Sequence, residues 1–242
     1  MRRYRGIVLL LVVLAVALGT AWWLWRPKPD SAAEKVAPMS VVPQGSSTVK
    51  RPDPTIDRTG WPVIVAFGDS LTAGLGVAPE ENYPSQLQAL LDDQGYKYRV
   101  VNAGISGDLS LGGLNRVESI LEHEPAIVIV ELGANDGLQG KSVTDMKQNL
   151  GGIIERLQQA EVKVVLAGME APPNYGPEYT QEFRGVFKEL ADRYQVALIP
   201  FFLEGVGGMP DLNRADGIHP TAEGYTIVVK TVMRALEPLL TK

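Results

Sequence analysis

From Trp61 onward, short apolar runs alternate with longer amphipathic stretches, and this alternation limits the folds open to the chain. We expect strands at Val63–Phe67, Tyr98–Asn102, Ala126–Glu131, Val162–Ala167 and Val196–Pro200. We expect helices over about Tyr83–Gln94, Leu111–Glu122, Val143–Ala160, Pro177–Tyr194 and Thr221–Leu239. Such alternation produces right-handed crossovers, and hence a parallel sheet with helices on both faces. The sequence therefore predicts a three-layer α/β/α domain with about five parallel strands over residues 61–242.

The first 26 residues have the features of a membrane anchor. Residues 7–25 contain no charge, and a helix that crosses the hydrocarbon core needs about 20 such residues. Three arginines precede this run, and Trp22, Trp23 and Trp25 lie at its far end, where indole rings favour the interface. We expect a single-pass helix in a bacterial inner membrane, with the domain on the periplasmic side. A signal peptide cleaved near residues 15–17, which would release a secreted protein, is the alternative.

Residues 27–60 differ in composition from both neighbouring segments. Six prolines stand among Ser, Lys and Asp, and such a segment buries too little apolar surface to fold by itself. We expect a flexible linker between the anchor (1–26) and the domain (61–242).

The domain carries 14 Lys and Arg against 24 Asp and Glu, which argues against nucleic-acid binding. The chain contains no cysteine, so a thiol nucleophile and thiolate metal sites are excluded.

The residue types that carry chemistry follow the predicted strands. GDS (68–70) follows the first strand, NAGISGD (102–108) the second, and ELGAND (131–136) the third. In open parallel sheets, ligands bind at the carboxyl ends of the strands. We therefore expect these three turns to meet at one edge of the sheet, with Ser70 presented there.

A serine hydroxyl becomes an effective nucleophile only when a base accepts its proton. The chain has two histidines, and His123 lies in LEHEP, where it is expected to be a solvated residue at a helix end. His219 lies in ADGIHP, three residues after Asp216. This spacing allows the carboxylate to hold one imidazole nitrogen while the other faces Ser70. Alternatively, Asp216 only caps the helix that begins near Thr221.

Acyl transfer also requires hydrogen-bond donors for the developing oxyanion. The sequence offers the backbone N–H of Ser70, the backbone N–H of Gly107 and the side-chain amide of Asn135. Ordinary turn formation explains Gly and Asn equally well when each is considered alone. We expect no cofactor and no metal, because Asp69, Asp108 and Asp136 stand where they can support turns by hydrogen bonding.

Four blocks, FGDSLTAG, NAGISGD, ELGAND and DGIHP, resemble in order and spacing the sequence blocks of the GDSL or SGNH hydrolases. The resemblance spans about residues 63–240 and is greatest to the bacterial arylesterase, acyl-CoA thioesterase I and lysophospholipase L1 group. It implies a flavodoxin-like fold, a nucleophile at Ser70, an acid and base at Asp216 and His219, and an oxyanion hole of Ser70, Gly107 and Asn135. Gly104 competes with Gly107 for that last role, and PPNYGPEY (172–179) resembles a loop beside the substrate.

These observations predict a serine esterase that hydrolyses ester or thioester bonds through a Ser-His-Asp triad and an acyl-enzyme. The expected partners are a small-molecule ester or a lipid-derived acyl substrate, and the membrane through the N-terminal helix. The predicted location outside the cytoplasm argues against acyl-CoA as the substrate. Two alternatives stay open: a carbohydrate O-acetylesterase with the same site, and a non-catalytic anchored binding module. The oligomeric state does not follow from the sequence.

Overall fold

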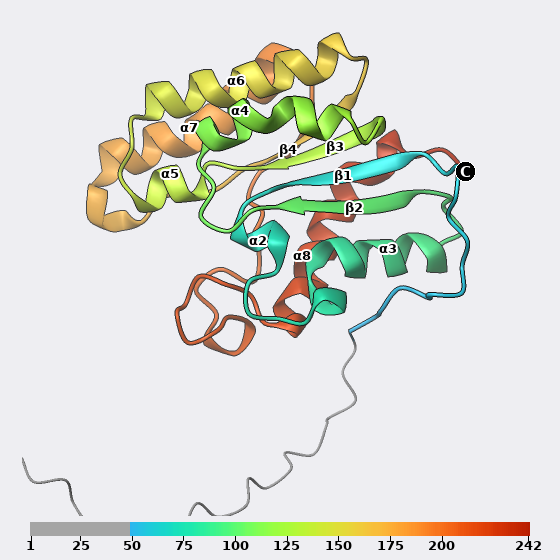
Figure 1. The fold of residues 1–242 in the computed structure, drawn as a ribbon. Helices are drawn as coiled ribbons and strands as arrows, with labels where there is room; N and C mark the ends of the chain where they lie inside the picture. Colours follow the sequence, from blue (N-terminus) through green and yellow to red (C-terminus); the bar gives the residue numbers. More distant parts are fainter. Residues whose placement is uncertain (1–48) are drawn as a thin grey trace, which may run out of the picture. The chain divides into compact units, whose positions relative to one another are not determined.

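The fold is built around one parallel sheet, seen here in a computed structural model that describes residues 49–242 (Figure 1). Its five strands are β1 (Val63–Gly68), β2 (Arg99–Gly104), β3 (Pro125–Glu131), β4 (Lys163–Ala167) and β5 (Ala197–Ile199). They lie in the order β2-β1-β3-β4-β5, and every neighbouring pair is parallel. The central strands β1 and β3 are almost entirely apolar and buried, as strands covered on both faces must be.

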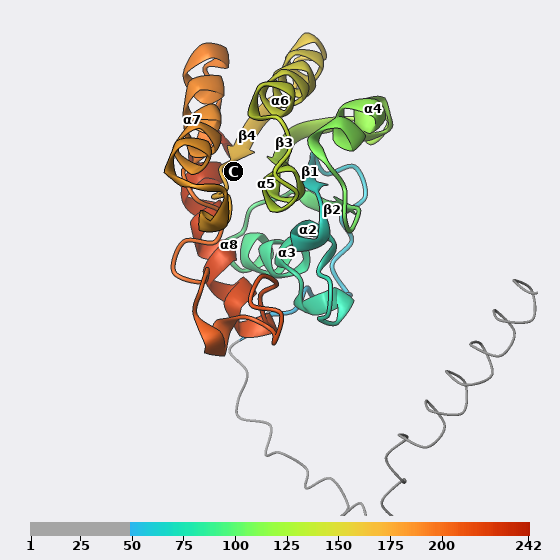
Figure 2. The same ribbon diagram turned by 90° about the vertical axis from the view of Figure 1, so that its left-hand side faces the viewer.

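Helices cover both faces of this sheet (Figures 1 and 2). One layer contains α3 (Tyr83–Asp93) and α8 (Ala222–Leu236). The other contains α4 (Ser110–Leu121), α6 (Val143–Gln159) and α7 (Pro177–Tyr194). Each amphipathic helix turns its apolar side to the sheet, and residues from both layers join one buried core. The predicted parallel α/β/α sheet is thereby confirmed.

Two short helices were not expected from the sequence. Helix α2 (Ser70–Ala73) follows β1 directly, and α5 (Ala134–Leu138) follows β3 after a turn at Gly133. Both are too short to show helical periodicity, and both lie at the carboxyl edge of the sheet, which faces the viewer in Figure 2. Helix α8 ends at Leu236 rather than Leu239, because Pro238 lacks the N–H that would continue it and a 3₁₀ turn follows.

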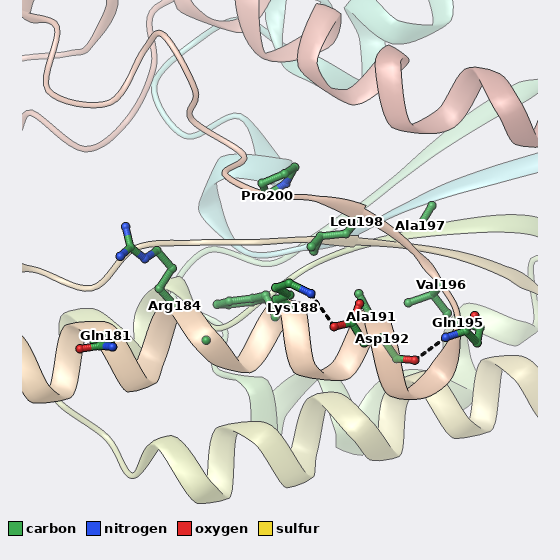
Figure 3. A pocket seen from close by; sticks show the side chains of 12 residues that line it. Gln181, Arg184, Lys188, Ala191, Asp192, Gln195, Val196, Ala197, Leu198 and Pro200 are labelled. Carbon is green, nitrogen blue, oxygen red and sulfur yellow. Dashed lines mark hydrogen bonds and ion pairs between the residues drawn. The ribbon is translucent and has the colours of Figure 1, made fainter.

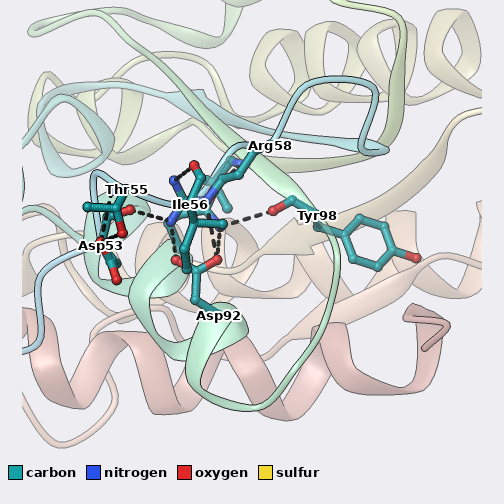
Figure 4. A network of polar contacts seen from close by, with 8 residues as sticks. Asp53, Thr55, Ile56, Arg58, Asp92 and Tyr98 are labelled. Atoms are coloured by element: carbon teal, nitrogen blue, oxygen red, sulfur yellow. Dashed lines mark hydrogen bonds and ion pairs between the residues drawn. The ribbon is translucent and has the colours of Figure 1, made fainter.

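Residues 49–60, which the sequence assigns to the flexible linker, lie against α3 (Figure 4). The Arg58 guanidinium forms an ion pair with Asp92 of α3, and it donates to the carbonyl oxygens of Asp53 (3.0 Å) and Ile56 (3.2 Å). Gln88 donates to Asp92 at 2.9 Å and to the carbonyl of Tyr98 at 3.0 Å, which links the network to β2. The last twelve residues of the predicted linker are therefore attached to the domain.

The predicted anchor at residues 7–25 lies outside the described residues. Within residues 49–242, no helix is both long enough and apolar enough to cross a bilayer.

Candidate active site

The turn after β1 presents Ser70 at the carboxyl edge of the sheet. A Cβ at Gly68 would lie 2.1 Å from the Thr72 hydroxyl oxygen and 2.6 Å from the Glu131 carbonyl oxygen, so the turn closes only around glycine. Asp69 caps α2 by accepting from the N–H of Leu71 at 2.9 Å. Ser70 therefore begins a short helix, and its backbone N–H has no protein acceptor among residues 49–242.

The structure brings His219 and Asp216 to this serine. The Ser70 Oγ lies 2.9 Å from His219 Nε2, across 149 positions of sequence, and His219 Nδ1 lies 3.0 Å from Asp216 Oδ2. The second oxygen of Asp216 accepts from the N–H groups of Ile218 and His219, each at 3.0 Å. The three side chains predicted from sequence therefore form one continuous chain of hydrogen bonds.

Asp216 is held in its ionised form although its side chain is 43% exposed. The N–H of Ile218, the N–H of His219 and the His219 ring lower the pKa of Asp216 to about 2, in that order of size. The alternative of a helix cap does not apply, because Thr221 is the residue that caps α8, accepting from the N–H of Gly224 at 3.1 Å. The other histidine, His123, is exposed just after α4, as expected.

The candidates for the oxyanion donors lie in two further turns. Gly107 has a φ of +82°, and its N–H has no protein acceptor within residues 49–242. Gly104 differs, because its N–H donates to Asn102 Oδ1 at 2.9 Å and its Cα packs against α2, where a Cβ would lie 2.2 Å from the Ala73 nitrogen. Gly104 thus serves packing, and only Gly107 of the two has a free donor.

Asn135 lies in α5 and lines the same cavity as Ser70 and His219. Its amide nitrogen donates to Asp69 Oδ2 at 2.9 Å and to the carbonyl oxygen of Asp108 at 3.0 Å. Both amide hydrogens are therefore engaged within the protein. To bind an oxyanion, the amide must share or exchange one of these two hydrogen bonds.

A buried acidic pair, Asp69 and Glu131, lies beside the turn that carries Ser70, and Glu131 was not singled out from the sequence. Glu131, at the end of β3, is fully buried, and its Oε2 accepts from the Thr72 hydroxyl at 2.8 Å. Its Oε1 has no protein partner within the described residues. Burial, with the nearby negative charge of Asp69, raises the pKa of Glu131 well above its usual range, and burial raises the pKa of Asp69 to about 6. An acidic residue that ends an otherwise apolar strand was the available sequence signal.

A cavity of about 120 Å³ opens beside Ser70 and His219. Its apolar walls come from residues that sequence analysis did not assign to the site, namely Leu71, Leu138, Met169, Leu203 and Ile218. Except for Leu71 in α2, each lies in a helix or loop that follows a later strand. The PPNYGPEY segment supports this wall from outside, because Tyr175 Oη donates to the carbonyl of Leu138 at 2.9 Å.

A larger cavity, of about 920 Å³, lies between α7 and the edge strand β5 (Figure 3). Its charged residues include Lys188 and Asp192, which pair with each other at 2.6 Å across one helical turn. Its lining contains no serine and no histidine, so it lacks the serine–histidine pair found beside the smaller cavity. Size alone therefore does not identify the reactive site in this molecule.

The three acidic residues considered for a metal are all engaged in the protein. Asp108 pairs with Arg116 at 2.8 Å, and Asp136 accepts from the N–H and the hydroxyl of Ser110 at 2.8 and 2.6 Å. Asp69 accepts from Leu71 and Asn135. These contacts support the turns after β1, β2 and β3, in the structural role expected from the sequence.

Comparison with known proteins agrees with this geometry. The sequence profile of the GDSL-like Lipase/Acylhydrolase family matches residues 66–227. The chain belongs to this family. Membership makes it an ester hydrolase and confirms the resemblance found in the four sequence blocks.

Alignments with individual relatives cover most of the length of each relative. Esterase TesA of Pseudomonas aeruginosa is 44% identical over 178 residues, which are 73% of this chain and 89% of that protein. Thioesterase 1/protease 1/lysophospholipase L1 of Escherichia coli K12 is 37% identical over 179 residues, 73% of this chain and 84% of that protein. The crystal structure of TesA superposes with a TM-score of 0.71 and 44% identity, covering 74% of this chain and 99% of that one.

Proposed function

We propose that this protein hydrolyses carboxylic ester and thioester bonds with Ser70 as nucleophile, His219 as general base and acid, and Asp216 as the group that orients His219. The observation that carries the proposal is the unbroken contact from Ser70 Oγ to His219 Nε2 (2.9 Å) and from His219 Nδ1 to Asp216 Oδ2 (3.0 Å). The GDSL family membership and the esterase relatives support the same chemistry.

In the acylation step, the Ser70 oxygen attacks the carbonyl carbon while His219 Nε2 takes the hydroxyl proton. The ionised Asp216 accepts a hydrogen bond from the Nδ1–H of His219 without taking its proton, which fixes the tautomer with Nε2 free and stabilises the imidazolium that forms. His219 then gives its proton to the departing alcohol or thiol, leaving an acyl-Ser70 ester. Water, deprotonated by the same imidazole, then attacks the acyl carbon, and His219 returns that proton to the Ser70 oxygen as the acid leaves, which restores the free serine.

The negative oxygen of each tetrahedral intermediate needs donors, and we assign the N–H groups of Ser70 and Gly107 to that task. Neither donates within the described protein, so neither loses a hydrogen bond when the oxyanion forms. Asn135 is the third donor, and it shares or exchanges a hydrogen bond now made to Asp69 or Asp108. Donors fixed before the reaction stabilise the transition state without the cost of reorganising solvent.

The lining of the cavity beside Ser70 indicates that the apolar acyl chain is the part of the substrate that enters it. The apolar side chains of the cavity surround Ser70, whereas its other polar side chains are Asp69, Asn135, Glu170 and His219. Such a lining favours an acyl chain over a sugar, which needs matching hydrogen-bond donors and acceptors. Comparison of kcat/KM for acetyl and longer acyl esters of one alcohol tests this, because a carbohydrate O-acetylesterase would prefer the acetyl ester.

We further propose that residues 7–25 anchor the enzyme in a bacterial inner membrane with the domain in the periplasm. The support is the uncharged run itself, the arginines before it and the tryptophans at its far end. A membrane location would place lipid-derived acyl esters within reach of the site. Protease accessibility of the domain in intact spheroplasts, compared with permeabilised ones, tests the orientation.

The decisive test of the chemistry is replacement of the nucleophile in the full chain. Ser70→Ala should lower kcat by about 10⁵–10⁶-fold. It should also abolish labelling by a serine-directed fluorophosphonate. Ser119→Ala removes an exposed serine of α4 and is the matched control, which should keep full activity and labelling. Undiminished hydrolysis by Ser70→Ala, or a label on another peptide, would show that the nucleophile is elsewhere.

A further inference from the structure

The large exposed apolar side chains within residues 49–242 lie at one edge of the sheet. Within residues 49–242, the large apolar residues that are more than a third exposed all follow the carboxyl end of a strand and precede or begin the next long helix. After β1 and β2 these are Leu75, Ile105 and Leu111. After β3, β4 and β5 they are Leu138, Tyr175, Met209 and Ile218. We call these seven residues the apolar rim.

Five of the seven rim residues contact or line the candidate active site. Leu75 N–H donates to the Ser70 carbonyl at 3.0 Å, and Ile105 N–H donates to the Gly68 carbonyl at 3.0 Å. Leu138 and Ile218 line the cavity that holds Ser70, and Tyr175 contacts Leu138. The rim and the cavity mouth therefore lie at the same edge of the sheet, the edge that faces the viewer in Figure 2.

The opposite edge has a different character. The turns that enter β3, β4 and β5 there contain Glu122, His123, Glu124, Glu161 and Gln195, all of them exposed. Isolated apolar residues on a surface are normal, but apolar residues that all gather at one edge mark an interaction surface.

The occupant of this surface follows from the chain that lies outside the described residues. Residues 7–25 form the predicted membrane span, and 23 residues (26–48) separate it from the part of the chain held against α3. A flexible chain of that length spans about 25 Å on average. A domain of this size has a radius of gyration of about 16 Å. A flexible linker of this length, as predicted from the sequence, would therefore keep the domain within its own dimensions of a bilayer and would let the rim turn toward it.

We propose that the apolar rim docks onto the lipid surface, so that the cavity mouth opens directly into the outer region of the bilayer. This inference rests on the proposed membrane anchor. The domain carries 14 basic against 24 acidic residues, so attraction to anionic headgroups cannot drive the contact. Docking through apolar insertion should occur on zwitterionic lipid and should persist when salt is raised.

The absence of cysteine in the natural chain makes the test direct, because one introduced cysteine carries the only label. The full chain is reconstituted in phosphatidylcholine vesicles with a nitroxide at Leu111→Cys or at Met209→Cys. These positions follow β2 and β5, the two outermost strands, and therefore sample opposite ends of the rim. His123→Cys, exposed on the opposite edge, is the matched control.

For each labelled position we take the ratio of the nitroxide relaxation caused by oxygen, which enters lipid, to that caused by a water-soluble nickel complex. Docking predicts that this ratio is several-fold higher at positions 111 and 209 than at position 123, at low and at high salt. Equal ratios at all three positions would overturn the proposal. Exclusion of both reagents at the rim, increasing with protein density, would overturn it too, because a second copy would then cover the rim.

Two further measurements separate this result from the proposals on which it rests. Flotation of the chain with the vesicles reports the anchor, and hydrolysis of a soluble ester by each labelled chain reports the catalytic site. A chain that floats and hydrolyses the ester, but whose relaxation ratio is the same at both edges of the sheet, would disprove only the docking. A chain that does not float would disprove the anchor and, with it, the docking.

Discussion

Asp216 lies on one side of the Ser70–His219 pair, and the buried pair Asp69 and Glu131 lies on the other. The fold shifts the pKa values of these carboxyl groups in opposite directions. Asp216 is partly exposed and accepts hydrogen bonds from two backbone N–H groups and the imidazole, which lower its pKa to about 2. Asp69 and Glu131 are buried beside the turn that carries Ser70, and burial raises the pKa of both. Environment rather than residue type therefore decides which carboxyl keeps its charge.

The difference assigns distinct tasks to the two sets. In the proposed mechanism Asp216 stabilises an imidazolium and must therefore be ionised at the working pH, and the turn around Gly217 supplies two N–H donors that favour the ionised form. A group that only holds a turn closed can be partly or fully neutral. Glu131 and Asp69 connect the ends of β1 and β3 through Thr72, Leu71 and Asn135, and this connection does not require charge on both.

The largest effect that tests the comparison is expected at Asp216. Asp216→Asn keeps the size of the side chain but removes the charge and allows the wrong histidine tautomer, so kcat should fall by about 10³–10⁴-fold. Asp211→Asn, in the 3₁₀ turn before Asn213, is the matched control and should retain activity. A loss of less than tenfold at Asp216 would mean that water can replace this carboxylate.

A smaller effect is expected at Asn135, which belongs to both regions because it contacts Asp69 and lines the cavity. Asn135→Ala should lower kcat by about 10²–10³-fold, with a much smaller change in KM, because an oxyanion donor acts mainly in the transition state. Asn174→Ala removes an exposed loop amide and is the control. A variant in which only KM changes would indicate that Asn135 binds substrate rather than the oxyanion.

Asp216 and the turn residue Asp69 were both predicted from the sequence, whereas Glu131 was missed for a physical reason. Ser70, Asp216 and His219 occupy short turns whose spacing alone indicates chemistry, and the strand order brings those turns together. The role of Glu131 depends on its distance from Thr72, 59 positions away, which no local pattern contains. The same limit applies to Arg58, whose packing against Asp92 of α3 cannot be read from the proline-rich composition around it.

The buried pair should affect stability rather than catalysis, with a defined pH dependence. A carboxyl whose pKa is raised by folding is neutral in both states at low pH, and it opposes folding once the unfolded chain ionises. For Asp69 the rise from the ordinary 3.8 to about 6 places this loss of stability between about pH 4 and pH 6. Glu131 contributes in the same direction, because its pKa is also raised.

Glu131→Gln removes that contribution while keeping an oxygen for the Thr72 hydroxyl. The Tm of the variant relative to the natural chain should therefore increase from pH 4 to pH 8, by several degrees in all, with kcat nearly unchanged. Glu122→Gln, on the exposed end of α4, should give a pH-independent difference. A relative Tm that does not vary with pH would mean that Glu131 is ionised in the folded protein.

The smallest expected effect is the change in stability caused by Asp216→Asn, which should differ in its pH dependence from that of Glu131→Gln. Asp216 has a lowered pKa, so its contribution to stability is fully present above about pH 4 and is lost as the pH falls toward 2. Asp216→Asn should lower Tm by a small amount that is constant between pH 5 and pH 8, and the difference should shrink at pH 3. Between pH 5 and pH 8, the difference in Tm from the natural chain should then be constant for Asp216→Asn and should vary with pH for Glu131→Gln. The same slope in both would contradict the view that exposure to N–H donors and burial in the core set these carboxyl groups apart.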